Sequence, residues 1–247
     1  MRKSNTLRAR FLYFLLRIKL KLKQFTKESN IKKVERIYPG YINYIKQLDD
    51  GGAMGGRAFP WRAIEQIRVL DISSPSSIIE FGSGTSSALF LEYLNKKENT
   101  EMVSFDESET YAKLTEDAIE NYISNDKNIL KIIYAPKKVN SKGSYYDSIK
   151  LQSCDLLYID GPTVEIINGK KSANQDIIHM FEKNIYPKVI MVDGRIDTVK
   201  AILDLEGKNY KFYPSMMYSV NSTKNLISHI FNIFFTNYER HSVLIRK

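Results

Sequence analysis

Residues 77–87 read SIIEFGSGTSS, and their order predicts three elements of local structure. A short apolar run ends at Glu80 and Phe81, glycines follow at positions 82 and 84, and the apolar residues of 88–94 are typical of a helix. The stretch therefore predicts a strand, a tight loop and a helix N-terminus in succession. Glycine lets a loop approach a ligand closely, and a helix start offers free N–H groups and a partial positive charge.

Short apolar runs alternate with helical patterns through the rest of the chain. The runs predict strands at 78–81, 102–105, 129–134, 155–159 and 188–192. The intervening patterns predict helices over 86–96, 109–123, 173–183 and 198–205. Nearly continuous apolar runs indicate strands that are covered on both faces. We therefore expect an α/β fold, a doubly wound, mostly parallel Rossmann-like sheet, with an antiparallel C-terminal addition from 210–217 and 240–246.

Acidic residues end four of the predicted strands. They are Glu80, Asp106 (followed by Glu107), Asp160 and Asp193. Because the carboxyl ends of parallel strands meet at one edge of a sheet, we expect these carboxylates to lie close together. Such a cluster is unfavourable without a ligand, a cation or hydrogen-bond donors. The sequence therefore predicts a ligand-binding site at this edge.

The spacing of Gly84 and Asp106 is that of a nucleotide-type ligand site. Asp106 lies 22 residues after Gly84, where an acid at the end of the second strand can accept both hydroxyls of a ribose. The spacing suits both NAD and S-adenosyl-L-methionine (SAM). A dinucleotide fingerprint requires a third glycine or alanine, where this chain has Ser87, and an acid at Glu80 is less usual there. Carboxylates also suit the sulfonium cation of SAM better than they suit a pyrophosphate.

Three motifs resemble those of the class I SAM-dependent methyltransferase family. EFGSGT at 80–85 resembles the family's E-x-G-x-G motif, FDE at 105–107 its second-strand acid, and DLLYIDGP at 155–162 its fourth-strand motif. The resemblance covers about residues 75–205. The family often has an acid or amide for the adenine after the third strand. Here Tyr134, Ala135 and Pro136 stand there, so no adenine contact is assigned.

The resemblance implies roles for individual residues. Gly82, Ser83 and Gly84 would line the methionine part of SAM, Asp106 would hold the ribose, and Asp160 would lie beside the transferring methyl group. The other residues assigned to the cofactor site are Glu80, Ser86 and Glu107.

The chemistry at Asp160 and Asp193 has several readings. Methyl transfer to a hydroxyl or amine needs alignment and a base, and Asp160 is the candidate base, with Asp193 as a second catalytic residue. Catechol-type O-methyltransferases resemble this chain in having two carboxylates at these strand ends, which there bind Mg²⁺. That subfamily has an amide where this chain has Gly194. In a third interpretation Asp193 and Gly194 have a structural role only, and Arg195 pairs with a carboxylate.

The net charge of +9 belongs to the N-terminal segment. Residues 1–37 carry +10 and the remainder carries −1, which argues against a nucleic-acid-binding body. Residues 7–25 predict a basic amphipathic helix, with an apolar stripe at Phe11, Leu15, Ile18, Leu22 and Phe25. Its continuous apolar run is too short to span a membrane. The helix would lie on an anionic membrane surface, pack on the domain or a partner, or serve as a nucleic-acid-binding arm.

The sequence therefore predicts three segments: a basic arm (1–37), a helical connection or lid (38–74) and a SAM-binding methyltransferase domain (75–247). A single cysteine fits a reducing, cytoplasmic location, and the arm adds a peripheral position at the inner face of the membrane. We expect O-methylation of a small-molecule or glycan acceptor, with a lipid-linked saccharide fitting the arm. The alternatives are an NAD(P)-dependent oxidoreductase and a non-catalytic Rossmann-like module docked to a membrane or partner.

Overall fold

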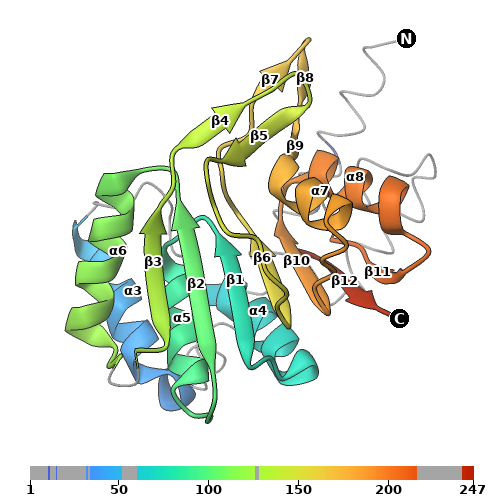
Figure 1. Ribbon diagram of the computed structural model, residues 1–247. Helices are drawn as coiled ribbons and strands as arrows, with labels where there is room; N and C mark the ends of the chain where they lie inside the picture. The colour runs from blue at the N-terminus through green and yellow to red at the C-terminus, as the bar shows by residue number, and fades with distance from the viewer. Residues whose placement is uncertain are drawn as a thin grey trace.

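Within the part of the chain that the structure describes, seven strands form one sheet in the order β11-β12-β10-β6-β1-β2-β3 (Figure 1). The strands are β1 (Ser77–Phe81), β2 (Glu101–Asp106), β3 (Leu130–Tyr134), β6 (Leu156–Ile159), β10 (Val189–Asp193), β11 (Tyr210–Tyr213) and β12 (His241–Arg246). Five of them run parallel, and β12 is antiparallel to both β10 and β11. The predicted doubly wound α/β sheet with an antiparallel C-terminal addition is confirmed.

The computed structural model describes residues 34–51, 60–125, 128–215 and 241–247, together with Phe11, Leu15 and Lys32. Apart from Phe11 and Leu15, the predicted amphipathic helix at 7–25 lies outside the described residues, as do residues 52–59 of the predicted lid. No helix in the described ranges is long and apolar enough to span a membrane.

Helices cover both faces of the sheet, as nearly continuous apolar strands require. On one face α3 (Pro39–Gly51), α4 (Pro60–Ser73), α5 (Thr85–Leu94) and α6 (Glu109–Tyr122) enclose the larger apolar core. On the other, α7 (Gln175–Glu182) and α8 (Ile196–Glu206) enclose the second core over β6 and β10 (Figure 1). Alternate strand residues point into the two cores, so Ile78 belongs to the first and Ile79 to the second.

The predicted connection contains a helix, α3, that is part of the core. Tyr38, Tyr41, Ile42 and Ile45 are buried, at the spacing of one helical face. The helix start is held by Glu92 of α5, whose carboxylate accepts hydrogen bonds from the backbone N–H groups of Gly40 (3.2 Å) and Tyr41 (2.8 Å). A carboxylate at a helix N-terminus satisfies free donors and the positive end of the helix dipole.

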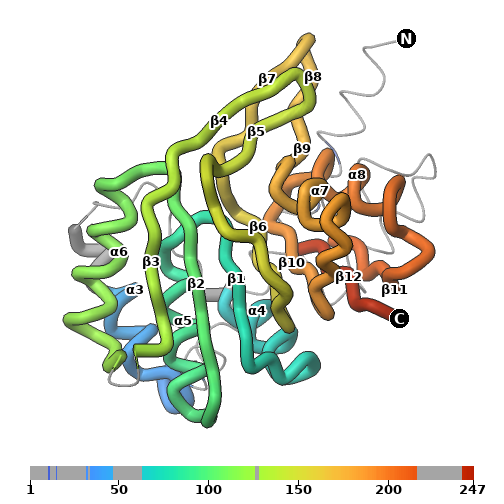
Figure 2. Tube along the Cα trace, viewed as in Figure 1, coloured from blue at the N-terminus to red at the C-terminus, as the bar shows by residue number. Residues whose placement is uncertain are grey.

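The segments that flank β6 were not predicted. Between β3 and β6 the chain forms β4 (Lys137–Val139) and β5 (Gly143–Tyr146) and no helix. After β6 it forms β7 (Ile166–Ile167), β8 (Lys170–Lys171) and β9 (Ala173–Asn174). Strands β4, β5 and β9 make a small sheet, β7 and β8 a hairpin, and both project beyond the carboxyl edge of the main sheet (Figures 1 and 2).

Candidate functional site

The strand register brings three of the predicted acids to one level. Phe81 of β1 pairs with Phe105 of β2 and with Ile159 of β6, so Asp106 and Asp160 follow on either side of Gly82. Val192 pairs with Ile159, which puts Asp193 beside Asp160. The carboxyl edge of the sheet therefore carries Asp106, Asp160 and Asp193 around the loop of Gly82–Gly84, called the glycine loop below. Glu80 lies two residues before Gly82, deeper in the sheet.

The glycine loop lies against the backbone that follows β6. Gly82 has a φ of +96°, and its N–H donates to the carbonyl of Phe105 (2.8 Å). A Cβ at Gly82 would lie 2.8 Å from the backbone nitrogen of Gly161. Both the positive φ and this approach require glycine. At Gly84, by contrast, a Cβ would meet no atom of the described residues within 4 Å, which leaves space for a ligand beside the loop.

Asp106 joins the glycine loop to the β2–α6 turn. Its Oδ2 accepts hydrogen bonds from the backbone N–H (3.0 Å) and the hydroxyl (2.8 Å) of Ser83. Its Oδ1 accepts from the backbone N–H of Ser108 (2.9 Å). A carboxylate has about four acceptor sites, and these three hydrogen bonds leave one of them free. A second site becomes free if the Ser83 hydroxyl turns away. The loop and the acid are thus already held in one arrangement.

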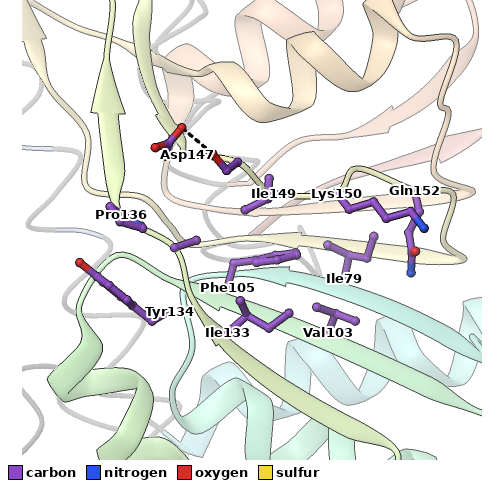
Figure 3. A pocket seen from close by; sticks show the side chains of 12 residues that line it. Ile79, Val103, Phe105, Ile133, Tyr134, Pro136, Asp147, Ile149, Lys150 and Gln152 are labelled. Carbon is purple, nitrogen blue, oxygen red and sulfur yellow. Dashed lines mark hydrogen bonds between the residues drawn. The ribbon is translucent and has the colours of Figure 1, made fainter.

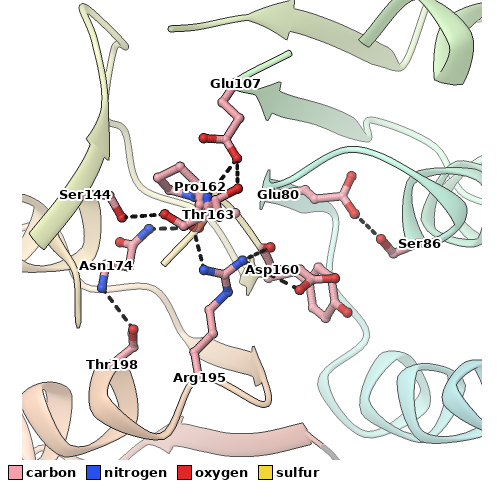
Figure 4. A network of polar contacts seen from close by, with 12 residues as sticks. Glu80, Ser86, Glu107, Ser144, Asp160, Pro162, Thr163, Asn174, Arg195 and Thr198 are labelled. Carbon is pink, nitrogen blue, oxygen red and sulfur yellow. Dashed lines mark hydrogen bonds and ion pairs between the residues drawn. The ribbon is translucent and has the colours of Figure 1, made fainter. Parts of the chain in front are cut away.

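Glu107 connects the opposite sides of the carboxyl edge. Its Oε1 accepts hydrogen bonds from the backbone N–H (2.8 Å) and the hydroxyl of Thr163, which follows β6 (Figure 4). Its Oε2 lies 3.6 Å from the ammonium group of Lys137 on β4. These contacts make Glu107 a link between β2 and the projecting strands.

Glu80 supports the loop from inside the protein. It is fully buried, and its carboxylate accepts hydrogen bonds from the hydroxyls of Ser86, Ser87 and Ser104. Ser86 and Ser87 lie in the first turn of α5, so Glu80 fixes the start of that helix under the loop. Burial raises the pKa of Glu80 to about 7, although the three hydroxyls lower it. Glu80 and Ser86 therefore support the glycine loop from inside the protein.

The raised pKa of Glu80 predicts a pH-dependent difference in stability between the wild type and Glu80→Gln. The folded protein retains a proton that the unfolded chain releases between pH 4.5 and about 7. Its contribution to stability is therefore present below 4.5 and is lost as the pH rises through the folded pKa of about 7. We expect the free energy of unfolding of the variant, relative to the wild type, to rise by on the order of 3 kcal/mol across this window.

Urea unfolding of both proteins between about pH 5 and pH 8 measures this difference. Burial also raises the pKa of Asp176 to about 7, but Asp176 is present in both proteins and cancels in the comparison. A difference that stays constant over this range would show that folding does not change the ionisation of Glu80.

Arg195 holds the loop after β6. From the start of α8 it donates to the carbonyls of Pro162 (2.6 Å) and Asp160, and it lies 3.7 Å from the Asp160 carboxylate (Figure 4). Arg195 therefore pairs with a carboxylate, that of Asp160, as one of the interpretations expected. The Asp160 side chain is 42% exposed, so it remains accessible from solvent, whereas Asp193 is buried.

The residues around Asp160 do not fit a Mg²⁺ site. The guanidinium of Arg195 already places a positive charge 3.7 Å from the Asp160 carboxylate, which disfavours a divalent cation there. Gly194 offers no side-chain donor, and no group of three or more His, Cys, Asp or Glu among the described residues is arranged to hold a metal.

Sequence reasoning missed a buried network behind Asp193. His241 pairs with Asp193 across β10 and β12, and its Nδ1 lies 2.5 Å from a carboxylate oxygen of Glu65 on α4. Its Nε2 lies 3.2 Å from the hydroxyl of Tyr158 on β6. All three side chains are buried. Glu65 is four residues before the buried Val69 on α4, so helical spacing could have identified it as an acid on the buried face.

Tyr146 of β5 was also missed. Its ring packs against Phe81 and Phe105, and its hydroxyl lies where a Cβ of Gly161 would stand. The hydroxyl is buried with no hydrogen-bond partner among the described residues, and burial raises the pKa of Tyr146. A tyrosine of β5, a strand that was not predicted, thus fixes the close approach of the glycine loop to the loop after β6. No local signal in the sequence indicates this role of Tyr146.

A cavity of about 620 Å³ lies on the sheet face that the β3–β6 connection crosses without a helix. Ile79, Val103, Phe105 and Ile133 form its apolar floor, and residues 147–150 and 152 line its other side (Figure 3). One end is formed by residues 134–136. Because Tyr134 pairs with Asp106 across β2 and β3, this end lies beside the predicted ribose-binding acid.

Comparison with solved structures identifies the fold. A Staphylococcus aureus protein, provisionally assigned as a caffeoyl-CoA O-methyltransferase, matches 90% of this chain and 100% of its own at 10% identity, with a TM-score of 0.52. An O-methyltransferase of Bacillus cereus in complex with SAH matches 87% of this chain and 96% of its own at 12% identity, with a TM-score of 0.46. No protein-family model matches the sequence, and no curated protein matches it. The first similarity shows that the chain has the fold of class I methyltransferases, as the motifs predicted.

Proposed function

We propose that this protein is a SAM-dependent methyltransferase that methylates an oxygen atom of a small-molecule or glycan acceptor. The observation that carries the proposal is the contact between Ser83 and Asp106. It joins the glycine loop after β1 to the acid that ends β2, beside open space at Gly84. This arrangement offers loop backbone for the amino-acid part of a ligand and a carboxylate beside it for the ribose.

The same geometry supports an orientation for the cofactor. The methionine part would lie over Gly82–Gly84, and Asp106 would accept the ribose hydroxyls as the Ser83 hydroxyl turns away. Strand β3 lies on the far side of β2 from the glycine loop. The adenine would therefore extend towards the end of the cavity formed by residues 134–136, which supplies apolar contacts in place of an acid or amide.

The charges at the carboxyl edge favour SAM over NAD. Asp106 and Asp160 lie on either side of the glycine loop. Two carboxylates attract a sulfonium cation and repel a pyrophosphate. Among the described residues of the edge, the one guanidinium, that of Arg195, is engaged by the carbonyls of Asp160 and Pro162, so it does not offset this preference.

Asp160 is the proposed base. When bound, SAM supplies a methyl group on a positively charged sulfur and leaves as S-adenosylhomocysteine (SAH). The exposed Asp160 carboxylate would accept the hydrogen bond of the acceptor hydroxyl, orient its oxygen and take its proton as the new bond forms. Arg195 would hold the Asp160 backbone in place through the carbonyl contact. Asp193, buried beside Asp160, would support Asp160 from inside the protein and would not contact the acceptor.

The acceptor and its location are part of the same proposal. The body of the chain carries no excess of positive charge, which supports an acceptor other than nucleic acid. The basic segment 7–25 supports a peripheral position at the cytoplasmic face of a membrane, where a lipid-linked saccharide would be within reach. The division into an arm, a connection and a methyltransferase domain remains a prediction.

Ligand-induced stabilisation tests the proposal. We expect SAH at about 100 times its dissociation constant to add about 2.7 kcal/mol to the free energy of unfolding. For a chain of this size that corresponds to roughly 5–10 °C in melting temperature. NADH at the same concentration should give no shift, since the carboxylates repel its pyrophosphate. A shift with NADH and none with SAH would favour the oxidoreductase, and the absence of both would favour a non-catalytic module.

A further inference from the structure

The hairpin β7–β8 projects beyond the carboxyl edge of the sheet. Its strands are joined by Asn168 and Gly169, whose φ values of +51° and +73° are those of a type I′ turn. Ile166 pairs with Lys171, and Ile167 with Lys170. Directly opposed residues of an antiparallel pair share a face, so each face of the hairpin carries one isoleucine and one lysine.

Apolar surface is exposed at this hairpin. Ile166 is 70% exposed, the highest value among the large hydrophobic side chains that the structure describes. Most of this β-branched aliphatic side chain is therefore left uncovered by the described residues. A single exposed isoleucine is common on protein surfaces, but this one is surrounded by lysines.

The lysines near the tip differ from those at the base of the projecting strands. At the base, Lys137 lies 2.6 Å from Glu165, and Lys138 lies 2.9 Å from Asp147. The tip carries Lys142, Lys170 and Lys171, which are all exposed and form no ion pair within the described residues. Lys142 lies in the β4–β5 turn. The next residue, Gly143, pairs with Ala173 of β9, which follows the hairpin directly.

The base of the hairpin is fixed to the candidate site. Thr163 donates to Glu107, and its carbonyl accepts a hydrogen bond from the Ser144 hydroxyl (3.1 Å; Figure 4). Only five residues separate Asp160 from Ile166. The tip therefore points away from the protein on the same edge that carries the proposed base (Figure 1).

We propose that the β7–β8 hairpin docks this protein on an anionic lipid surface. Ile166 enters the interface between headgroups and acyl chains, while Lys142, Lys170 and Lys171 contact the anionic headgroups. Their aliphatic stems can lie along the apolar region while the ammonium groups stay at the headgroups. The tip turns the carboxyl edge, and with it Asp160, towards the membrane. That last step rests on the proposed function, whereas lipid binding does not.

The side chains at the tip favour lipid over nucleic acid. Single-stranded nucleic acid is held by stacking on aromatic rings together with basic groups. The hairpin offers isoleucines and no aromatic residue. An exposed aliphatic side chain surrounded by unpaired lysines is instead complementary to a surface that is both apolar and negatively charged.

A fluorophore at the tip of the full chain tests the proposal. Ile166→Cys would be labelled with an environment-sensitive dye, and Ile72→Cys would serve as the matched control. Ile72 is 64% exposed, near the end of α4 and before the amino end of β1. Burial raises the pKa of Cys154 to about 12, so the native thiol does not compete for the label near neutral pH.

We expect vesicles of phosphatidylcholine with phosphatidylglycerol to shift the emission of the label at position 166 to the blue, and to leave the label at position 72 unchanged. Pure phosphatidylcholine should give no shift. Lys170→Glu with Lys171→Glu should weaken the response about tenfold or more, and raised salt should weaken it as well.

An unchanged signal at position 166 while the chain sediments with the vesicles would overturn the proposal, since another segment would then bind the lipid. Absence of sedimentation would overturn it too, as would binding of a single-stranded RNA oligonucleotide without vesicle binding. SAH stabilisation of the labelled protein, measured without vesicles, separates this outcome from failure of the methyltransferase proposal.

Discussion

Replacing Asp106 with Ala should lower the affinity for SAH by about 100-fold, because two hydrogen bonds from ribose hydroxyls to a carboxylate are lost. Each such bond contributes about 1.5 kcal/mol or more, and the two together correspond to this factor. Asp106 is 7% exposed and already accepts three hydrogen bonds from Ser83 and Ser108. The variant also loses these contacts, so the glycine loop is less ordered before the ligand binds. Isothermal titration with SAH measures the change.

Two further variants separate ligand contact from folding. Asp106→Asn keeps an oxygen that can accept from Ser108 but replaces the other with an NH₂ group, so its affinity should fall between those of the wild type and the alanine variant. Asp204→Ala removes an exposed carboxylate near the C-terminal end of α8 and should bind SAH like the wild type. Wild-type affinity in Asp106→Ala would show that the ribose is held elsewhere.

Gly82→Ala should both destabilise the protein and abolish SAH binding. The added Cβ would lie 2.8 Å from the nitrogen of Gly161 and 2.9 Å from the carbonyl carbon of Asp160, and both are backbone atoms. Neither backbone can move freely, because Asp160 donates its N–H to Phe81 and its carbonyl is held by Arg195. We expect a loss of about 3 kcal/mol or more, which is roughly 6–12 °C in melting temperature.

Gly169→Ala is the matched control for backbone strain. Gly169 has a φ of +73°, yet a Cβ there would lie more than 4 Å from the atoms that the structure describes around it. Its substitution should therefore cost about 1–2 kcal/mol from the positive φ alone and leave SAH binding intact. If the two alanine variants are equally stable, the contact between the glycine loop and Gly161 is not what requires glycine at position 82.

Periodicity and strand-end chemistry predicted the positions of the acids. Short apolar runs mark buried strands wherever they occur, so β1, β2, β6 and β10 could be placed from the sequence, and with them Asp106 and Asp160. The pairing of Arg195 with a carboxylate was also among the predicted alternatives.

The projecting strands and α3 were harder to predict. Strands β7, β8 and β9 have two residues each, too few for any periodicity to appear. Tyr146 and Thr163 take their roles from contacts with Gly161 and Glu107, which follow other strands. Helix α3 has helical spacing in its tyrosines and isoleucines, and a helical connection or lid was predicted over 38–74, but not that this helix would be part of the core.

The turn at Gly82–Gly84, the order of the main-sheet strands with the helices that follow them, and the acids at four strand ends could be read from the sequence, since these depend on residues close together in the chain. What each acid does depends on the tertiary structure. Glu80 and Asp160 both stand at strand ends. Burial beneath α5 raises the pKa of Glu80, whose carboxylate accepts hydrogen bonds from the serines of α5 and β2, while Asp160 stays accessible beside Arg195. Burial and partners depend on register and on the helix that covers each strand, and these are set by contacts between distant segments.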